Sequence, residues 1–174
     1  IEEGSRLLAE NAGDAEDVGG TITVAASHSL LLDDSLLSVS TASAGDAGTI
    51  YVESPEVVLQ NGPGYFHDFV DPTDPRNQPH PTEVGVSADT SGRGAGGTIR
   101  IDAGSLAIQQ GVDVSASTLG ERATGDAGSI VINADSVDVL DRSSVAAVAF
   151  GSQGNAGTIQ LDVHGGLRVD ATRL

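Results

Sequence analysis

A short motif that begins with glycine recurs five times and limits the possible folds more than any other feature of this sequence. In each copy the glycine precedes Thr or Ser, then Ile, then a further apolar residue two positions on. The intervals between successive copies are 28, 49, 31 and 29 residues. Three of the four intervals cluster near one period, and self-similarity of this length is the signature of stacked repeats. The copies begin at Gly20, Gly48, Gly97, Gly128 and Gly157.

Each period contains three short runs in which apolar residues occupy every second position. After Gly97 these runs cover residues 98–103, 106–108 and 112–118. A period of two is the pattern of a β-strand, and the Gly, Asn, Asp and Ser residues between the runs favour turns. No window of the sequence shows a sustained helical stripe with caps, so we expect little helix.

A unit of about 29 residues cannot bury its apolar face alone and must stack on its neighbours. We therefore predict an all-β fold, a right-handed single-stranded parallel β-helix (solenoid) with about five three-stranded rungs. Aromatic residues make up only 3 % of the chain, so small aliphatic side chains must fill the interior. Two inward columns follow from the motif: Ile22, Ile50, Ile99, Ile130 and Ile159, and beside them Val24, Val52, Ile101, Ile132 and Leu161.

Both ends of the sequence align with the middle of a turn. Residues 4–9 match residues 143–146, and residues 167–169 match residues 137–139. We therefore expect residues 1–174 to be a single β-helix segment of a longer protein.

The long interval contains an insertion, residues 62–82, that departs from the repeat. It holds five of the six prolines and three of the five aromatic residues, and this proline density excludes regular structure. Loops that project from a rigid scaffold often carry binding residues, and aromatic rings stack on sugars or dock proteins. The alternative is that these rings fold back over the adjacent rungs. The candidate binding residues are Tyr65, Phe66, His67, Phe69 and His80.

The charge balance limits the partners. There are 25 acidic and 8 basic residues, a net charge of −17. Such a surface repels phosphate backbones and anionic lipids, so we expect no nucleic-acid partner. The sequence has no apolar run long enough to span a bilayer and no visible leader peptide, so we expect no membrane insertion. It also lacks cysteine, which excludes disulfides and thiol catalysis.

No catalytic motif is recognisable, and we predict no enzyme activity and no cofactor. Four acids lie in or beside predicted strands, but we identify no repeated pairing with Lys or Arg of the kind a lyase-like site needs: Asp102, Asp135, Asp162 and Asp170. No spacing of His and carboxylates matches a standard metal site, so no metal ligands are predicted. Calcium remains an alternative at predicted turns, where the same acids could instead accept backbone hydrogen bonds: Asp14, Asp17, Asp46 and Asp126.

Three stretches carry a family resemblance: residues 125–134 (GDAGSIVINA), residues 154–159 (GNAGTI) and residues 114–118 (VSAST). They resemble the repeats of filamentous-haemagglutinin-like exoproteins of two-partner secretion, especially the large cyanobacterial members. The resemblance covers nearly the whole chain except the insertion. The N-terminal secretion domain typical of such proteins is not recognisable here, so the chain looks like an internal repeat segment.

The resemblance implies a secreted protein on the bacterial outer surface, exported with an outer-membrane transporter partner and displayed as an adhesive stalk. We expect a surface carbohydrate or a protein receptor to contact the insertion. Two alternatives remain open: a fragment of a polysaccharide-active enzyme, and a calcium-dependent carbohydrate-binding module.

Overall fold

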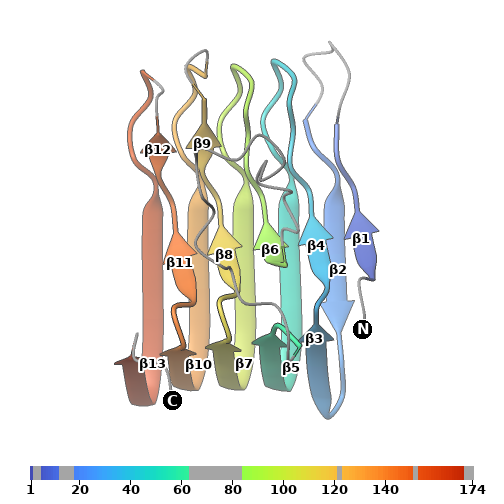
Figure 1. Cartoon of the computed structure of the whole chain (residues 1–174), viewed down its shortest axis with the longest axis vertical. Helices are drawn as coiled ribbons and strands as arrows, with labels where there is room; N and C mark the ends of the chain where they lie inside the picture. The colour runs from blue at the N-terminus through green and yellow to red at the C-terminus, as the bar shows by residue number, and fades with distance from the viewer. Residues whose placement is uncertain (2–4, 12–17, 63–83, 121–122, 151–152, 171–174) are drawn as a thin grey trace, which may run out of the picture.

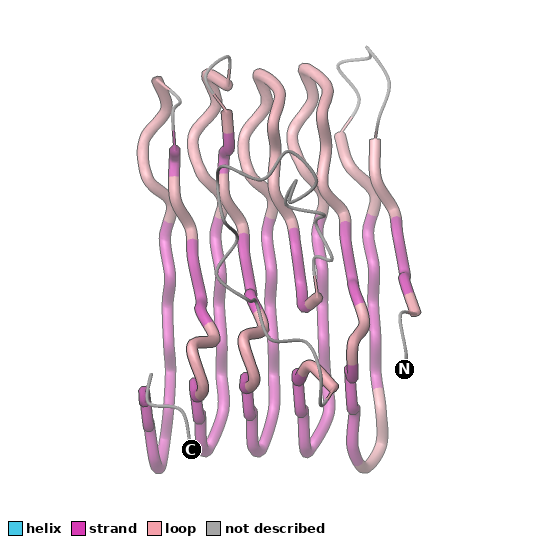
Figure 2. Tube along the Cα trace, viewed as in Figure 1, coloured by secondary structure: helices cyan, strands magenta, loops and turns pink. Residues whose placement is uncertain are grey.

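The structure is a computed structural model that describes residues 1, 5–11, 18–62, 84–120, 123–150 and 153–170. These residues form thirteen strands, and all the strand pairs are parallel. Figure 2 shows strands and loops throughout the described part of the chain, without a helix. None of the segments described is therefore a helix that could cross a membrane.

The fold is a parallel β-helix, as predicted, and its longest side is a six-stranded sheet (Figure 1). The order along this sheet is β13-β10-β7-β5-β2, and β3 pairs with β5 beside β2. Its strands are β2 (Thr21–Ala25), β3 (Ser29–Asp33), β5 (Thr49–Gln60), β7 (Thr98–Gln109), β10 (Ser129–Leu140) and β13 (Thr158–Asp170).

The two predicted inward columns are confirmed by the strand register. Ile99 pairs with Ile50 on one side and with Ile130 on the other, and Ile101 pairs with Val52 and Ile132. The same alignment continues to β2 and to β13. Five motif copies therefore form five layers of the sheet, and the chain makes about four turns from the first to the last, rather than five complete rungs.

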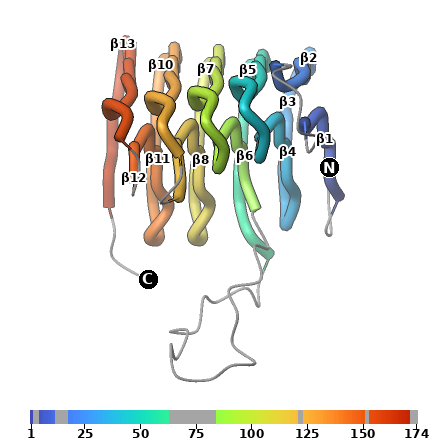
Figure 3. Tube along the Cα trace, turned by 90° about the horizontal axis from the view of Figure 1, so that it is seen from above, coloured from blue at the N-terminus to red at the C-terminus, as the bar shows by residue number. Residues whose placement is uncertain are grey.

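A second side consists of short strands in the order β1-β4-β6-β8-β11. They are β1 (Arg6–Leu8), β4 (Leu36–Ser38), β6 (Gly85–Ser87), β8 (Asp113–Ser115) and β11 (Ser144–Ala146). A third side pairs β9 (Thr118–Leu119) with β12 (Ala149–Phe150), and single bridges continue it along the stack. Seen from above, the turns lie next to one another as successive coils (Figure 3).

The first two predicted runs of each period are one long strand in the middle rungs. β5, β7 and β10 each have 12 residues and bend without ending. The bend falls at Pro55, Gly104 and Asp135, which are absent from the pairing that continues on either side of them. Proline, glycine and aspartate at these positions favour a turn. Hydrogen bonds to parallel strands on both sides nevertheless keep each strand continuous through the bend.

Small aliphatic side chains fill the core, as the composition predicted. Ile50, Ile99, Ile101, Ile130 and Ile132 are each 0 % exposed. Such columns pack closely between strands about 4.8 Å apart.

In every copy after the first, the glycine that starts the motif lies very close to the backbone of the turn before it. A Cβ on Gly128 would collide with the carbonyl oxygen of Gly97, and one on Gly97 with that of Gly48. Only a residue without a side chain fits there, so this column explains why glycine always precedes the Thr-Ile or Ser-Ile pair.

Hydroxyl groups tie the rungs of the second side together around one carboxylate. Asp89 accepts hydrogen bonds from the Oγ atoms of Ser87 (2.8 Å) and Ser115 (2.6 Å). It also accepts one from the backbone N–H of Ser117. Because Ser115 and Ser117 belong to the following turn, Asp89 joins two layers of the stack.

Candidate functional site

The five binding residues predicted in the insertion, Tyr65, Phe66, His67, Phe69 and His80, lie outside the described residues. The structure does describe where the insertion leaves the rod. The Gly62 N–H donates to Asp34 Oδ1 at 2.8 Å, and Asn61 Nδ2 donates to the Gln110 carbonyl at 2.8 Å. The start of the insertion is therefore hydrogen-bonded to the turn before it and to the turn after it.

A polar cluster lies on the outer face of the long sheet, on strands β5, β7 and β10. The register places Tyr51 beside Arg100, and Glu53 beside Asp102, which in turn pairs with Asn133. These residues alternate with the buried isoleucines and valines, so the period of two that fills the core directs them to the outside.

Asp102 is the centre of this cluster. Arg100 donates to both oxygens of its carboxylate, from Nε at 2.8 Å and from Nη2 at 3.0 Å. Asn133 Nδ2 donates to the same carboxylate from the next turn. On the preceding strand, the Tyr51 hydroxyl donates to Glu53 Oε2 at 3.3 Å. Hydrogen bonds thus join the side chains of β7 and β10, and the Tyr51–Glu53 pair lies on the strand beside them.

The electrostatics of the cluster follow from these contacts. Partial burial tends to raise the pKa of Asp102, but hydrogen bonds from Arg100, Asn133 and Tyr51 outweigh it, so the net pKa lies below its ordinary value. Its negative charge raises the pKa of Tyr51 and of Arg100, chiefly through their hydrogen bonds with Asp102. At neutral pH the cluster therefore presents an ionised Asp102, a cationic Arg100 and a neutral phenol.

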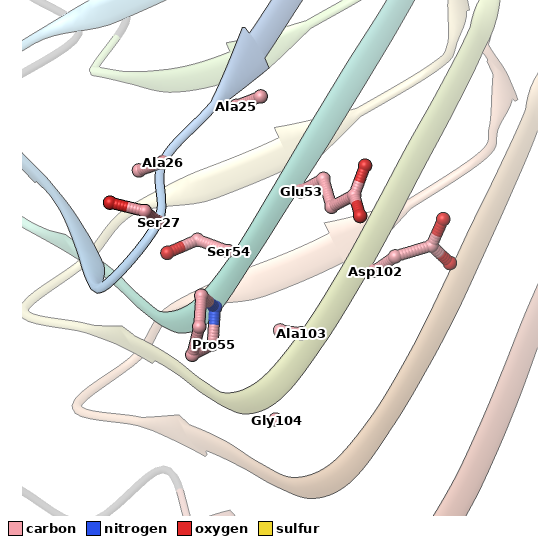
Figure 4. A pocket seen from close by; sticks show the side chains of 9 residues that line it. All are labelled: Ala25, Ala26, Ser27, Glu53, Ser54, Pro55, Asp102, Ala103 and Gly104. Atoms are coloured by element: carbon pink, nitrogen blue, oxygen red, sulfur yellow. The ribbon is translucent and has the colours of Figure 1, made fainter.

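A groove runs beside the cluster, at the bend of the long sheet, and is open to solvent with a volume of ≈ 720 Å³. Glu53 and Asp102 project from neighbouring strands on the same side (Figure 4). The other lining residues are small: Ala25, Ala26, Ser27, Ser54, Pro55, Ala103 and Gly104. Small side chains make the hollow, and the two carboxylates supply the hydrogen-bond acceptors at its edge.

Sequence reasoning missed most of this cluster. It identified Asp102 and Asp170 as strand acids but did not pair either with the arginine two positions earlier on the same strand. The Arg100–Asp102 and Arg168–Asp170 ion pairs measure 2.8 and 2.9 Å. The missed signal is the spacing, because residues two apart in a strand share a face.

Of the other two strand acids, Asp135 lies at the bend of β10 and Asp162 lies on β13. The ring nitrogens of His164 are 3.9 Å from an oxygen of each carboxylate, Nδ1 from Asp135 and Nε2 from Asp162. All three side chains are well exposed, so this is a loose solvated group rather than a formed site.

Two of the four acids considered as calcium ligands, Asp46 and Asp126, accept hydrogen bonds from backbone N–H groups instead. Asp46 Oδ1 accepts from the Ala95 N–H at 2.7 Å, and Asp126 Oδ1 accepts from the Asn155 N–H at 2.7 Å. Each carboxylate thus joins one turn to the next. Asp14 and Asp17 lie outside the described residues, and the described ones contain no group of three or more His or acidic side chains placed to hold a metal.

Comparisons with known proteins were made at three levels. A scan against protein-family models, a search of curated proteins and a search of solved structures each found no match for this chain.

Proposed function

We propose that this chain is a structural and adhesive segment of a secreted β-solenoid protein that extends from a bacterial outer surface. The observation that supports this most directly is the parallel pairing that continues through the long sheet from β2 to β13. A stack of this kind lengthens by adding turns without changing its cross-section, which suits a stalk. The repeats that resemble two-partner exoproteins extend the proposal to export with an outer-membrane transporter.

Surface labelling tests the location. Antibodies raised against the purified chain should label intact cells of the source organism, and deletion of a transporter gene next to the coding sequence should abolish the label. Permeabilised cells provide the control for total protein. Labelling that requires permeabilisation in the unmodified strain contradicts a surface stalk.

The groove favours a second candidate function, the binding of a hydroxyl-rich polysaccharide. Carboxylates accept hydrogen bonds from sugar hydroxyls, and Arg, Asn and Tyr side chains can donate to them. Glu53 and Asp102 line the groove, and Arg100, Tyr51 and Asn133 stand in the same hydrogen-bonded cluster. The site is open and shallow, so it suits one stretch of a long polymer rather than an enclosed small molecule.

A binding assay on immobilised polysaccharides tests this candidate with matched variants. Glu53→Gln, which changes the groove, should weaken binding about tenfold, whereas Glu56→Gln should leave it unchanged because Glu56 is exposed on β5 outside the groove. If the wild type, Glu53→Gln and Glu56→Gln bind the polysaccharide equally, the groove does not make the contact.

The same assay examines the insertion and the alternatives. A variant with residues 63–83 replaced by a short turn should lose binding if the insertion makes the contact, and keep it if the groove does. Loss of binding with a chelator would indicate the calcium-dependent module, and new reducing ends or unsaturated products would indicate the enzyme. Binding without either effect supports an adhesive segment.

A further inference from the structure

The groove beside the outer cluster is built from the same part of three successive turns. The register places Ala25 beside Glu53, and Glu53 beside Asp102. Parallel strands lie about 4.8 Å apart, so the groove crosses the strands and runs along the axis of the rod. Each turn contributes one set of lining residues (Figure 4): residues 25–27, 53–55 and 102–104.

The close stacking of the turns keeps the floor of the groove free of large side chains. A Cβ on Gly104 would lie 2.6 Å from the carbonyl oxygen of Pro55 on the preceding turn, so only glycine fits at this position. Beside it, Ala103 pairs with Ser54, and both side chains are small. The hollow therefore follows from the packing of the backbone and does not depend on how long side chains are arranged.

Larger side chains bound the groove along one side. Tyr51 and Arg100 lie two positions before Glu53 and Asp102 on the same outward face, and they stand outside the groove. A ligand chain running along one strand would have to cross these side chains and would leave the groove after three residues. A ligand chain running along the axis stays in the groove over three turns.

The charge of the groove selects against acidic polymers. Its lining contains two acidic residues, Glu53 and Asp102, and no basic one, and the whole chain carries a net charge of −17. The cationic Arg100 is held by the carboxylate of Asp102. Glu53 accepts a hydrogen bond from Tyr51 at 3.3 Å, and an ionised carboxylate has room for about four. Hydroxyl groups of an uncharged sugar can therefore donate to Glu53, whereas a sugar acid would be repelled.

We infer that the groove binds an uncharged, extended, β-linked polysaccharide along the axis of the rod, with one sugar unit over each of the three turns. Each unit of such a chain is about as long as the spacing between strands, so successive units meet equivalent positions of successive turns. The inference rests on the polysaccharide binding proposed above, and it adds the direction, the length and the charge of the ligand.

A series of β-1,4-linked glucose oligomers tests the direction and the length. Each oligomer, from the disaccharide to the hexasaccharide, competes with immobilised β-1,4-glucan for the full chain. The affinity should rise about two- to tenfold from the disaccharide to the trisaccharide, the effect of about one further hydrogen bond, and should change little beyond it.

The outcomes of this series separate the inference from the proposed function. Inhibition that does not depend on oligomer length overturns the inference and leaves the proposed binding intact. Failure of the chain to bind the glucan also overturns the inference. Failure to bind any immobilised polysaccharide overturns the proposed binding as well.

A pair of leucine substitutions on β2 tests whether the ligand crosses the first turn. Ala25 lines the groove and Thr23 does not, and both are exposed on the outer face of the same strand. Ala25→Leu fills the groove at this turn, so the trisaccharide should bind only as well as the disaccharide, whose own affinity should not change. Thr23→Leu should leave both affinities unchanged. Unchanged binding of the trisaccharide to Ala25→Leu, or an equal loss in both variants, contradicts binding along the axis.

An acidic oligomer of the same length and linkage tests the charge. Oxidation of each primary hydroxyl of the trisaccharide to a carboxylate should weaken its inhibition at least about tenfold, because like charges then meet in the groove. Glu53→Gln should reduce this difference between the two oligomers, whereas Glu56→Gln, outside the groove on the same strand, should not. Equal inhibition of the wild type by the two oligomers shows that the groove does not select by charge and overturns the assignment of an uncharged ligand.

Discussion

β10 and β13 carry the same kinds of side chain in the same columns, yet they lie in different environments. Ile130 on β10 is 0 % exposed, whereas its partner Ile159 on β13 is 43 % exposed. β10 has a paired strand on both sides, whereas among the described residues β13 pairs with β10 alone, so less of the chain covers Ile159. In a solenoid the burial of a residue is thus a property of its position in the stack, and stability is a sum over adjoining turns.

The largest expected difference between the two strands is for a charge in the core column. Ile130→Asp leaves an unpaired carboxylate between two turns and should lower the free energy of unfolding by about 3–5 kcal/mol. Ile159→Asp should cost about 1–2 kcal/mol, because its charge reaches water and only part of an apolar side chain is lost. Urea denaturation of both variants measures this, and equal losses would disprove the inward column.

Glycine substitutions should give the next largest difference. Gly128→Ala forces a methyl group against the Gly97 carbonyl and should cost about 2–3 kcal/mol, since the clash is with backbone. Gly166→Ala on β13 meets nothing within 4 Å and should change stability by less than about 0.5 kcal/mol. Thermal unfolding compares the pair. A tolerated alanine at position 128 would mean that the turns are not as close as the structure places them.

The smallest expected difference is between two ion pairs with the same Arg-x-Asp spacing. Asp102→Asn on β7 removes the acceptor of Arg100 and Asn133 and should cost about 0.5–1 kcal/mol at neutral pH after solvent screening. Asp170→Asn on β13 should cost less, because the Asp170 side chain is more exposed, 34 % against 23 % for Asp102.

The pH dependence sharpens this last comparison. The pKa of Asp102 lies below its ordinary value of 3.8, so its contribution is complete above pH 3.8 and is lost as the pH falls further, through the lower folded pKa. The stabilities of the wild type and of Asp102→Asn should therefore converge in acid. A difference that persists in strong acid, where the Asp102 carboxylate is protonated, would show that its charge is not the cause.

The sequence alone predicted the columns of the core because both of their causes are local. A period of two places Ile99 and Ile101 on one face, and the recurring glycine marks where turns approach. It did not predict that the first two runs join, because Gly104 and Pro55 favour turns, and only pairing with neighbours on both sides keeps the strand continuous there.

The outer cluster was harder to predict for a physical reason. Tyr51, Asp102 and Asn133 are 51 and 31 residues apart in sequence, so their contact depends on the register of three turns. The period of two could have placed Arg100 beside Asp102, but the groove requires the bend of the sheet as well.

Pairing between neighbouring turns resumes unchanged across the insertion. Gln60 pairs with Gln109 before the insertion, and Gly85 pairs with Asp113 after it. Between these pairs, one turn is connected by residues 61–84 and the next turn by residues 110–112 alone. Chain length at this corner is therefore independent of the scaffold, and natural variation could change what the corner displays without altering the rod. For protein engineering, the same corner is a grafting point for foreign peptides, held at a fixed height along a rigid support.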